Sequence, residues 1–433
     1  MSLRPYPAYK PSGVEWLGNV PEHWGVAPLL GVAQARDESN EGMKEDNLLS
    51  LSYGRIVRKD ISSNEGLLPE SFETYQIVHP GDIVFRLTDL QNDQRSLRTA
   101  PVTEIGIITS AYLAVRPMHI KSGYFSHLLR CYDVIKVFYS MGGGLRQSMK
   151  YADVKRLPIL TPPKEEQVAI AAFLDCKTSK IDALIVEQEK LLALLVEKRQ
   201  ATISHAVTRG LIPGVALKDS GISWLGEVPA HWDIGGLTKF IGPVVDYRGR
   251  TPTKGDEGMF LVTAKNIRNG VIDYEASQEY VDPKEAATLL SRGAPEVGDV
   301  LFTTEAPLGQ VAQIDRADIA LAQRVVKFRG LPGLLDNRFL MFWLMGSSCR
   351  ARLEMLATGS TALGIKASKL GMIECLLPPI DEQKEISSHI EAQLKVNDAL
   401  QHEAQRAIEL LRERRSALIA AAVTGAVDVR DVA

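Results

Sequence analysis

Two stretches of the chain, SGVEWLGNVPEHW (12–24) and SGISWLGEVPAHW (220–232), are nearly the same sequence. Nine of their thirteen positions are identical, and the two copies are 208 residues apart. They hold four of the five tryptophans in the chain. A period of this length is far longer than the roughly 20–50 residues of a solenoid repeat. It indicates a duplicated half-chain, and we interpret each tryptophan segment as a buried turn at a domain edge rather than a ligand site.

A second pair of similar segments follows the tryptophan segments, at an offset of 216 residues. LTPPKEEQVAI (160–170) resembles LLPPIDEQKEI (376–386), and EKRQATISHAVTRG (197–210) resembles ERRSALIAAAVTGA (413–426). Between these markers, 30–140 and 240–355 share little identity. The chain therefore alternates a variable block with a shared segment, twice.

The shared segments predict two long helices. Each begins at a Pro-Pro pair followed by acidic residues, which suit the positive end of a helix dipole. Apolar residues then recur at three- and four-residue steps, as at Ile170, Leu174, Ile181, Leu195 and Ile203, and at Ile386, Ile390, Leu394 and Ile408. About 45 residues at 1.5 Å each give helices of roughly 65–70 Å. Because neither apolar stripe can remain in water, we expect the helices to pack together as an antiparallel coiled coil with a variable block at each end.

The predicted fold class is therefore α+β, with two mixed α/β blocks separated by two long helices and related by a pseudo-twofold internal repeat. The predicted boundaries are 1–160 for the first block, 161–212 for the first helix, 213–376 for the second block and 377–433 for the second helix. Strands are expected at 82–87, 107–115, 259–262, 300–303 and 325–328. Single helices are expected at 124–139 and 338–356.

Composition sets limits on function. The 433 residues are 45% hydrophobic and 24% charged, as in ordinary globular proteins, and the net charge of −3 excludes a uniformly basic nucleic-acid coat. Apolar runs such as 191–196 and 417–423 are too short for a membrane helix, and the N-terminus lacks the apolar core of a signal peptide. Four cysteines without a C-x-x-C pair are typical of a reducing compartment, so we expect a cytoplasmic protein with no membrane contact.

The sequence offers no catalytic apparatus. The Pro-Pro pairs lack the flanking Asn or Asp and aromatic residue of an amino-methyltransferase site, and the segment 359–366 only approaches a phosphate-binding loop, because Ile365 separates Gly364 from Lys366. His23 and His231 recur in the repeat without a second ligand at metal spacing, so we interpret them as structural. We therefore expect no catalytic residue, no metal site and no cofactor in this chain.

Polar, glycine-containing loops in the variable blocks are candidates for DNA contact. Arg pairs with guanine, Asn and Gln pair with adenine, and Lys, Ser and Thr also hold phosphates. The candidates in the first block are Arg86, Gln91, Asn92, Gln94, Arg95, Arg146, Gln147 and Lys150. Those in the second block are Arg248, Arg250, Thr251, Lys254, Lys265, Asn266, Arg268, Ser360, Thr361 and Lys366. The alternative is that these loops are ordinary solvated turns.

The order of these parts resembles a known family. The WLGxVPxHW segments, GDVLFTTEAPLGQVA (298–312), RGRTP (248–252) and the PPIDEQ helix start are similar to those of the specificity subunits of Type I restriction-modification systems. The first block departs from this pattern, with GDIVFRLTDLQNDQ (81–94), and Thr361-Ala362 replaces a frequent Thr-Gln.

The resemblance implies a non-catalytic protein whose variable blocks are target recognition domains. Each would read one half of a split double-stranded DNA target, and the helix pair would act as the spacer between them. Two methyltransferase subunits would dock on the chain and restriction subunits would join them. Adenine-N6 methylation, S-adenosylmethionine, ATP and Mg would belong to these partners. Two alternatives stay open, a coiled-coil scaffold with protein-binding end domains and an enzyme that acts alone.

Overall fold

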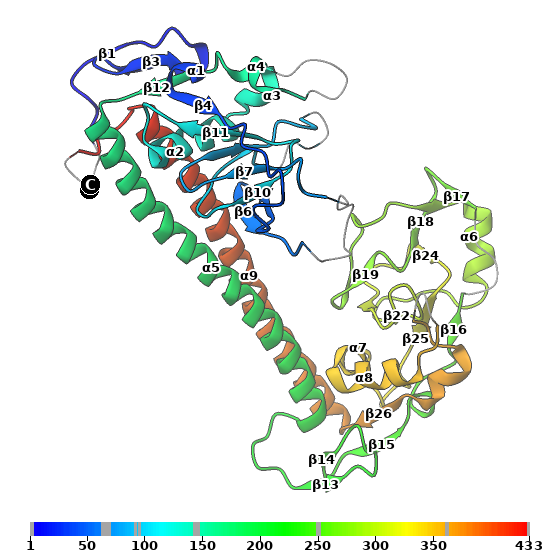
Figure 1. Ribbon diagram of the computed structural model, residues 1–433. Helices are drawn as coiled ribbons and strands as arrows, with labels where there is room; N and C mark the ends of the chain where they lie inside the picture. The colour runs from blue at the N-terminus through cyan, green and yellow to red at the C-terminus, as the bar shows by residue number, and fades with distance from the viewer. Residues whose placement is uncertain are drawn as a thin grey trace. The chain divides into compact units, whose positions relative to one another are not determined.

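The computed structural model describes residues 4–61, 71–90, 93, 97–141, 148–247, 253–359 and 363–430 (Figure 1). The chain forms two compact units. The first comprises 1–189 together with 406–433, and the second comprises 190–405. Each unit therefore contains one variable block and one end of each long helix.

The two long helices are α5 (Lys164–Arg209) and α9 (Ile380–Val423), of 46 and 44 residues. In the first unit, Asp182 of α5 forms an ion pair with Arg415 near the end of α9. In the second unit, Asn397 of α9 donates a hydrogen bond of 2.9 Å to the carbonyl oxygen of Leu195 in α5. Since positions later in α5 meet positions earlier in α9, the helices are antiparallel, and the predicted packed pair is confirmed.

The first unit is built on a four-stranded antiparallel sheet in the order β4-β11-β8-β9. Short pairs β1-β2, β3-β12, β5-β6 and β7-β10 surround it. The strands are β1 (Tyr9–Pro11), β2 (Asn19–Pro21), β3 (Gly25–Pro28), β4 (Ala33–Ala35), β5 (Leu49–Ser52), β6 (Arg55–Arg58), β7 (Gln76–Val78), β8 (Ile83–Phe85), β9 (Thr99–Pro101), β10 (Gly106–Ile108), β11 (Leu113–Pro117) and β12 (Pro158–Thr161). Its short helices are α1 (Leu29–Val32), α2 (Ser122–Val134), α3 (Val137–Met141) and α4 (Tyr151–Val154).

The second unit repeats this topology. Its four-stranded antiparallel sheet has the order β16-β25-β22-β23, and the pairs β13-β14, β15-β26 and β19-β20 match β1-β2, β3-β12 and β5-β6. A further sheet, β17-β21-β18-β24, contains one parallel pair, β18 with β24. The strands are β13 (Leu217–Asp219), β14 (Glu227–Pro229), β15 (Asp233–Gly236), β16 (Val245–Asp246), β17 (Lys254–Gly255), β18 (Met259–Val262), β19 (Ile267–Arg268), β20 (Val271–Ile272), β21 (Tyr280–Val281), β22 (Val300–Thr303), β23 (Val311–Gln313), β24 (Ile319–Leu321), β25 (Val325–Phe328) and β26 (Glu374–Leu377). The helices are α6 (Pro283–Leu290), α7 (Asn337–Met345), α8 (Ser347–Leu356) and the 3-10 helix η3 (Ala367–Met372).

Three predicted elements are each divided in two. The helix expected at 124–139 is α2 and α3, because Lys136 between them adopts a left-handed backbone with φ of 64°. The helix expected at 338–356 is α7 and α8, because Gly346 is extended. The strand expected at 107–115 is β10 and β11, joined by a turn in which Tyr112 N–H donates to Thr109 O.

Each variable block packs on helix ends that come from both long helices. In the first unit, the fully buried Trp24 belongs to one core with Ile170 of α5 and Val423 of α9. In the second unit, the fully buried Trp232 shares a core with Val207 of α5 and Ile386 of α9. The second indole of each segment thus anchors its block to the helices. The expectation that both indoles of a segment are buried is wrong for the first segment, because Trp16 is 42% exposed.

Candidate nucleic-acid interface

A carboxylate near the start of each long helix holds the tryptophan segment in place. In the first unit, Glu166 accepts hydrogen bonds from Tyr6 Oη (3.0 Å) and Trp24 Nε1 (3.0 Å), and His23 Nε2 lies 2.6 Å from its other oxygen. The repeat reproduces this arrangement, because Glu382 accepts from Trp232 Nε1 at 3.1 Å. His231 Nε2 lies 2.8 Å from the same carboxylate. The two histidines therefore serve in clamps that orient the blocks on the helices.

One backbone hydrogen bond in each block joins the segments that flank the predicted DNA loops. Met149 N–H donates to Leu87 O at 2.9 Å, which joins the segment after the glycine loop to the segment after β8. Ile365 N–H donates to Thr304 O at 2.9 Å, which joins the corresponding segments after β22. In both units, therefore, segments that are about 60 residues apart in sequence meet at the end of one central strand.

Two candidates of the first block are described at this junction. Arg86 is half-buried directly after β8, and its backbone N–H donates to Arg98 O at 2.8 Å. Lys150 is exposed at the start of α4. The bond between Met149 and Leu87 makes them neighbours in the fold. The other candidates lie outside the described residues: Gln91, Asn92, Gln94, Arg95, Arg146 and Gln147.

The candidates of the second block fall into two groups. Lys254 and Lys265 are exposed beside Glu279, and Lys254 Nζ lies 2.6 Å from its carboxylate. Burial alone would raise the pKa of Glu279, but the ammonium group of Lys254 and the charge of Lys265 hold that pKa below its ordinary value. Arg268 on β19 is exposed and paired with Asp273.

The second group surrounds the start of η3. Lys366 is exposed there, directly after Ile365, whose N–H bonds to Thr304 O. Next to it, Arg324 Nε lies 2.7 Å from Glu305 Oε1, and Glu305 forms a β-bridge with Gly364. The remaining candidates lie outside the described residues: Arg248, Arg250, Thr251, Ser360 and Thr361.

One candidate has a different environment from the others. Asn266 is fully buried, its side-chain oxygen accepts from Thr263 N (2.9 Å), and its amide nitrogen donates to Asp273 O (2.9 Å) and Ser277 O (2.8 Å). All its hydrogen-bonding atoms are therefore used inside the loop. In this position it organises the loop that carries Lys265 and Arg268.

Two further arginines of the loops differ in their exposure: Arg98, which the sequence groups with the polar loop of the first block, and Arg324, which was not singled out. Arg98 stands among exposed-looking polar residues, yet its side chain is fully buried and donates to the carbonyl oxygens of Thr88 (3.0 Å) and Asp89 (3.3 Å). Arg324 is half-exposed between β24 and β25, with φ of 72°. Sequence patterns carry no signal for either, because polarity alone does not tell an inward from an outward side chain.

Among the described residues, no group of three or more His, Cys, Asp or Glu side chains could hold a metal ion. In that same part of the chain, no helix has the length and apolar character needed to cross a lipid bilayer. What the fold does define is a class of protein with two α+β blocks of one topology, mounted on the ends of an antiparallel helix pair, and with charged loops at equivalent strand ends.

Comparison with known proteins identifies this class. The family described as Type I restriction modification DNA specificity domain matches residues 248–410. The specificity subunit of the EcoKI enzyme of Escherichia coli K12 is 21% identical over 94% of this chain and 90% of its own length. A Methanocaldococcus jannaschii protein that carries the name of specificity subunit of the type I enzyme MjaX is 24% identical over 87% of this chain and 88% of its own.

Solved structures share the fold. A chain from a type I restriction-modification system, described for its complex assembly and conformational transition, has a TM-score of 0.70 at 16% identity and covers 93% of this chain and 98% of its own. The HsdS subunit from Thermoanaerobacter tengcongensis has a TM-score of 0.53 at 17% identity, over 94% and 98%. Residues 248–410 thus match the Type I restriction modification DNA specificity domain, and the chain is similar over most of its length to specificity subunits of Type I restriction-modification systems.

Proposed function

We propose that the chain reads an asymmetric, two-part sequence in double-stranded DNA, one half with each variable block. The observation that carries this proposal is that the two blocks have the same strand order but different residues in the loops at the strand ends. A shared scaffold with different loops is what two readers of unrelated half-sites require, because sequence is read by side chains at base edges in the major groove. In this proposal, residues 1–160 and 213–376 are the two target recognition domains.

The proposed contacts follow from exposure. Arg86, Lys150 and Lys366 stand at the junctions of the paired loops, and Lys254, Lys265 and Arg268 present charge from the second block. The loop residues outside the described part of the chain stay within the proposal as base-reading or phosphate contacts. Asn266 enters it as a positioning residue, because its amide is already hydrogen-bonded within its own loop.

The helix pair is proposed as the ruler between the half-sites. Two half-sites on one face of the duplex lie about 34 Å apart for each helical turn of DNA. One helical turn inserted in α5 or α9 lengthens that helix by about 5 Å, which corresponds to a change of one or two base pairs in the spacer. The segments proposed for this role are 161–212 and 377–433.

Partner subunits are proposed to dock on exposed apolar side chains of the long helices. In the first unit Leu184 of α5 and Leu410 of α9 are 52% and 56% exposed, and in the second Leu194 and Val396 are 60% and 58% exposed. Apolar surface of this kind is typical of protein interfaces. We expect two methyltransferase subunits there, with restriction subunits joining them. Adenine-N6 methylation would then occur on the partners, which would hold S-adenosylmethionine, ATP and Mg.

The cellular setting proposed for the complex is the cytoplasm. The four cysteines are free thiols, and Cys131, Cys349 and Cys375 are buried. Burial raises the pKa of the Cys131 thiol to about 11, so this thiol stays protonated and unreactive. Unpaired thiols fit a reducing compartment.

The decisive experiment exchanges 30–150 for the equivalent block of another specificity subunit, in the complex assembled with its partners. Bound or methylated DNA is selected from a random duplex pool and sequenced at stated salt. We expect one half of the selected motif to change and the other half to stay the same. A change in both halves would contradict the assignment of one block to one half-site.

The same selection separates this function from that of a coiled-coil scaffold whose end domains bind proteins. A scaffold would enrich no sequence from the pool. A DNA reader enriches a split motif, and its affinity falls as salt rises, because phosphate contacts release counterions. Enrichment of nothing, in the presence of the methylating partner, would favour the scaffold.

A further inference from the structure

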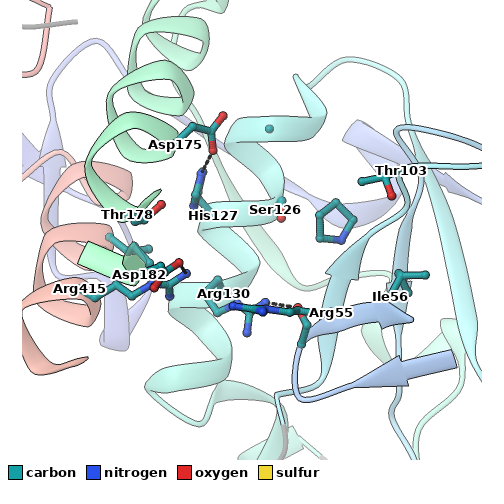
Figure 2. A pocket seen from close by; sticks show the side chains of 14 residues that line it. Arg55, Ile56, Thr103, Ser126, His127, Arg130, Asp175, Thr178, Asp182 and Arg415 are labelled. Carbon is teal, nitrogen blue, oxygen red and sulfur yellow. Dashed lines mark hydrogen bonds and ion pairs between the residues drawn. The ribbon is translucent and has the colours of Figure 1, made fainter. Parts of the chain in front are cut away.

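A polar pocket of the first unit lies where the variable block meets the long helices (Figure 2). Its volume is about 460 Å³. Its walls come from the β5-β6 hairpin, from α2, and from α5 and α9. We call it the junction pocket and define it by Arg55, Thr103, Ser126, Arg130, Thr178 and Arg415.

The charges in the junction pocket do not cancel. Asp182 is paired with Arg415, and Asp175 accepts a hydrogen bond of 2.8 Å from His127. Burial lowers the pKa of His127, so the imidazole is neutral at pH 7 and adds no charge. Arg55 and Arg130 form no ion pair with a carboxylate of the described residues. The lining therefore holds three arginines against Asp175 and Asp182, so one positive charge is left without a counter-charge.

Arg130 is the more deeply placed of the two. It reaches from α2 towards the hairpin, where it donates to Gly54 O at 2.5 Å (Figure 2). Burial is the main cause that lowers the pKa of Arg130. The charges of Asp133 and Asp182 act in the opposite direction, and those of Arg415 and Arg55 lower it further. An anion in the pocket would relieve this repulsion in a site that is partly shielded from water.

The duplicated unit shows that the fold does not require these charges. The hairpin turns Tyr53-Gly54 and Asn269-Gly270 correspond, since all four residues have positive φ. In the second unit the turn glycine faces the sulfur atoms of Met341 and Met345. In the first, it faces the guanidinium of Arg130.

The N-cap residues of α2 in the first unit and of α7 in the second give the register of this comparison. Lys121 and Asp336 are those residues, and the backbone N–H of each donates to the glutamine near the start of a long helix. Counting from them, Ser126 and Arg130 correspond to Met341 and Met345. After the turn, Arg55 corresponds to Val271. The first unit thus carries two arginines and a serine where the second uses apolar side chains.

The geometry points to a phosphate group as the ligand of the junction pocket, held by Arg55 and Arg130. Arginine forks bind carboxylate and phosphate. The hydroxyl groups of Ser126, Thr103 and Thr178 line the same pocket. Two guanidinium groups and several hydroxyl groups offer more hydrogen-bond donors than the two oxygens of a carboxylate can accept. The oxygens of a phosphate group suit this number of donors. The phosphate is that of a free phosphate compound or of the DNA backbone.

The first arm of the test measures binding of inorganic phosphate to the full chain by calorimetry, with ionic strength held constant by NaCl. The variants are Arg130→Met and Arg55→Val, which copy the second unit and are therefore compatible with the fold. We expect each to weaken phosphate binding about tenfold. Arg58→Val is the matched control, because Arg58 lies on the same hairpin outside the pocket and is paired with Glu104. This variant should bind phosphate like the unaltered chain.

The second arm measures binding of a short duplex without a target sequence. If the phosphate comes from the DNA backbone, R130M weakens duplex binding and lowers its salt dependence relative to R58V. If it comes from a free compound, R130M affects inorganic phosphate alone. The inference is overturned if the unaltered chain binds neither inorganic phosphate nor the duplex through these arginines. It is also overturned if R130M weakens only the association with a protein partner. Because the first arm uses no DNA target, its failure is distinct from a failure of the proposed function.

Discussion

Arg415 of α9 and Asp182 of α5 are joined by an ion pair in which Arg415 Nε lies 2.8 Å from a carboxylate oxygen. The aligned hydrogen bond comes from Nη2, which donates to the other oxygen at 3.2 Å. In the second unit Arg199 of α5 is paired with Asp398 of α9. Each residue of this pair is 216 positions from its counterpart, and the two helices have exchanged donor and acceptor. The duplication has therefore preserved the antiparallel contact of the helices as well as the helices themselves.

The first prediction concerns the register of the helix pair. Asn397 is buried in the seam, and its counterpart 216 positions earlier is the apolar Ile181. A polar residue at such a position fixes register at a cost in stability. We expect Asn397→Ile to raise the free energy of unfolding by about 1 kcal/mol and to broaden the range of spacer lengths accepted in DNA selection. Val396→Ile, at the exposed neighbouring position, should change neither the free energy of unfolding nor the range of accepted spacer lengths. An N397I variant that is less stable and has an unchanged spacer preference would contradict the prediction.

The second prediction concerns the clamps at the helix starts. Glu166→Ala leaves the buried Trp24 Nε1 and Tyr6 Oη without an acceptor, at a cost of about 1–3 kcal/mol for each group. We expect a total loss of about 3 kcal/mol by chemical denaturation. Glu382→Ala should cost less, because Glu382 holds an indole and a half-exposed histidine. The control is Glu165→Ala, which removes an exposed carboxylate from the same turn; an equal effect of this control would show that helix-end charge, and not the clamp, is responsible.

Much of the fold could be predicted from the sequence. The helices begin directly after the Pro-Pro pairs, and strands β18, β22 and β25 have the predicted bounds, because continuous apolar runs between turn residues leave few alternatives. The two divided helices were wrongly predicted as single helices, because one residue interrupts each of them. A single left-handed residue such as Lys136 ends a helix without changing the apolar pattern.

The similarity of the two variable blocks was only faintly visible in their residues, as in PGDIVF (80–85) and VGDVLF (297–302). The four-stranded sheets have the same strand order although the blocks share little identity. Burial of alternating apolar residues is enough to preserve a sheet, so identity can disappear while topology stays. In the candidate site, the type of residue made both Lys265 and Asn266 candidates for DNA contact, although Lys265 is exposed and Asn266 is buried. Only the fold distinguishes a side chain that can reach DNA from one that holds the loop.

The third prediction concerns pH. Burial raises the pKa of Asp133 from 3.8 to about 6, against the effect of hydrogen bonds from Thr99 Oγ1 and the backbone of Arg98 and Thr99. Between these values the folded state binds a proton that the unfolded chain has released. The free energy of unfolding therefore falls as pH rises from about 4 through 6.

Asp133→Asn removes this titration while keeping an acceptor for the same donors. Relative to this variant, the unaltered chain should lose about 2–3 kcal/mol of stability between pH 4 and pH 7, as measured by denaturation at several pH values. Asp37→Asn, at an exposed position, should follow the unaltered chain throughout. Parallel curves for D133N and the unaltered chain would show that Asp133 titrates normally.

The last prediction assigns Arg98 a positioning role in the first block. Its guanidinium donates to the carbonyl oxygens of Thr88 and Asp89, which lead into the candidate loop 91–95, and to Tyr139 Oη (3.1 Å) in the helix that leads into the glycine loop. One buried side chain thus ties both proposed recognition loops of this block together. Lysine keeps the charge but has a single nitrogen in place of the fork, so Arg98→Lys should weaken binding of one half-site about tenfold and leave the other unchanged. Competition with duplexes altered in either half, using the assembled complex, measures this, and Arg58→Lys is the exposed control. An equal loss at both half-sites would mean that Arg98 acts on overall stability, because a loop of one block can affect only the bases which that block reads.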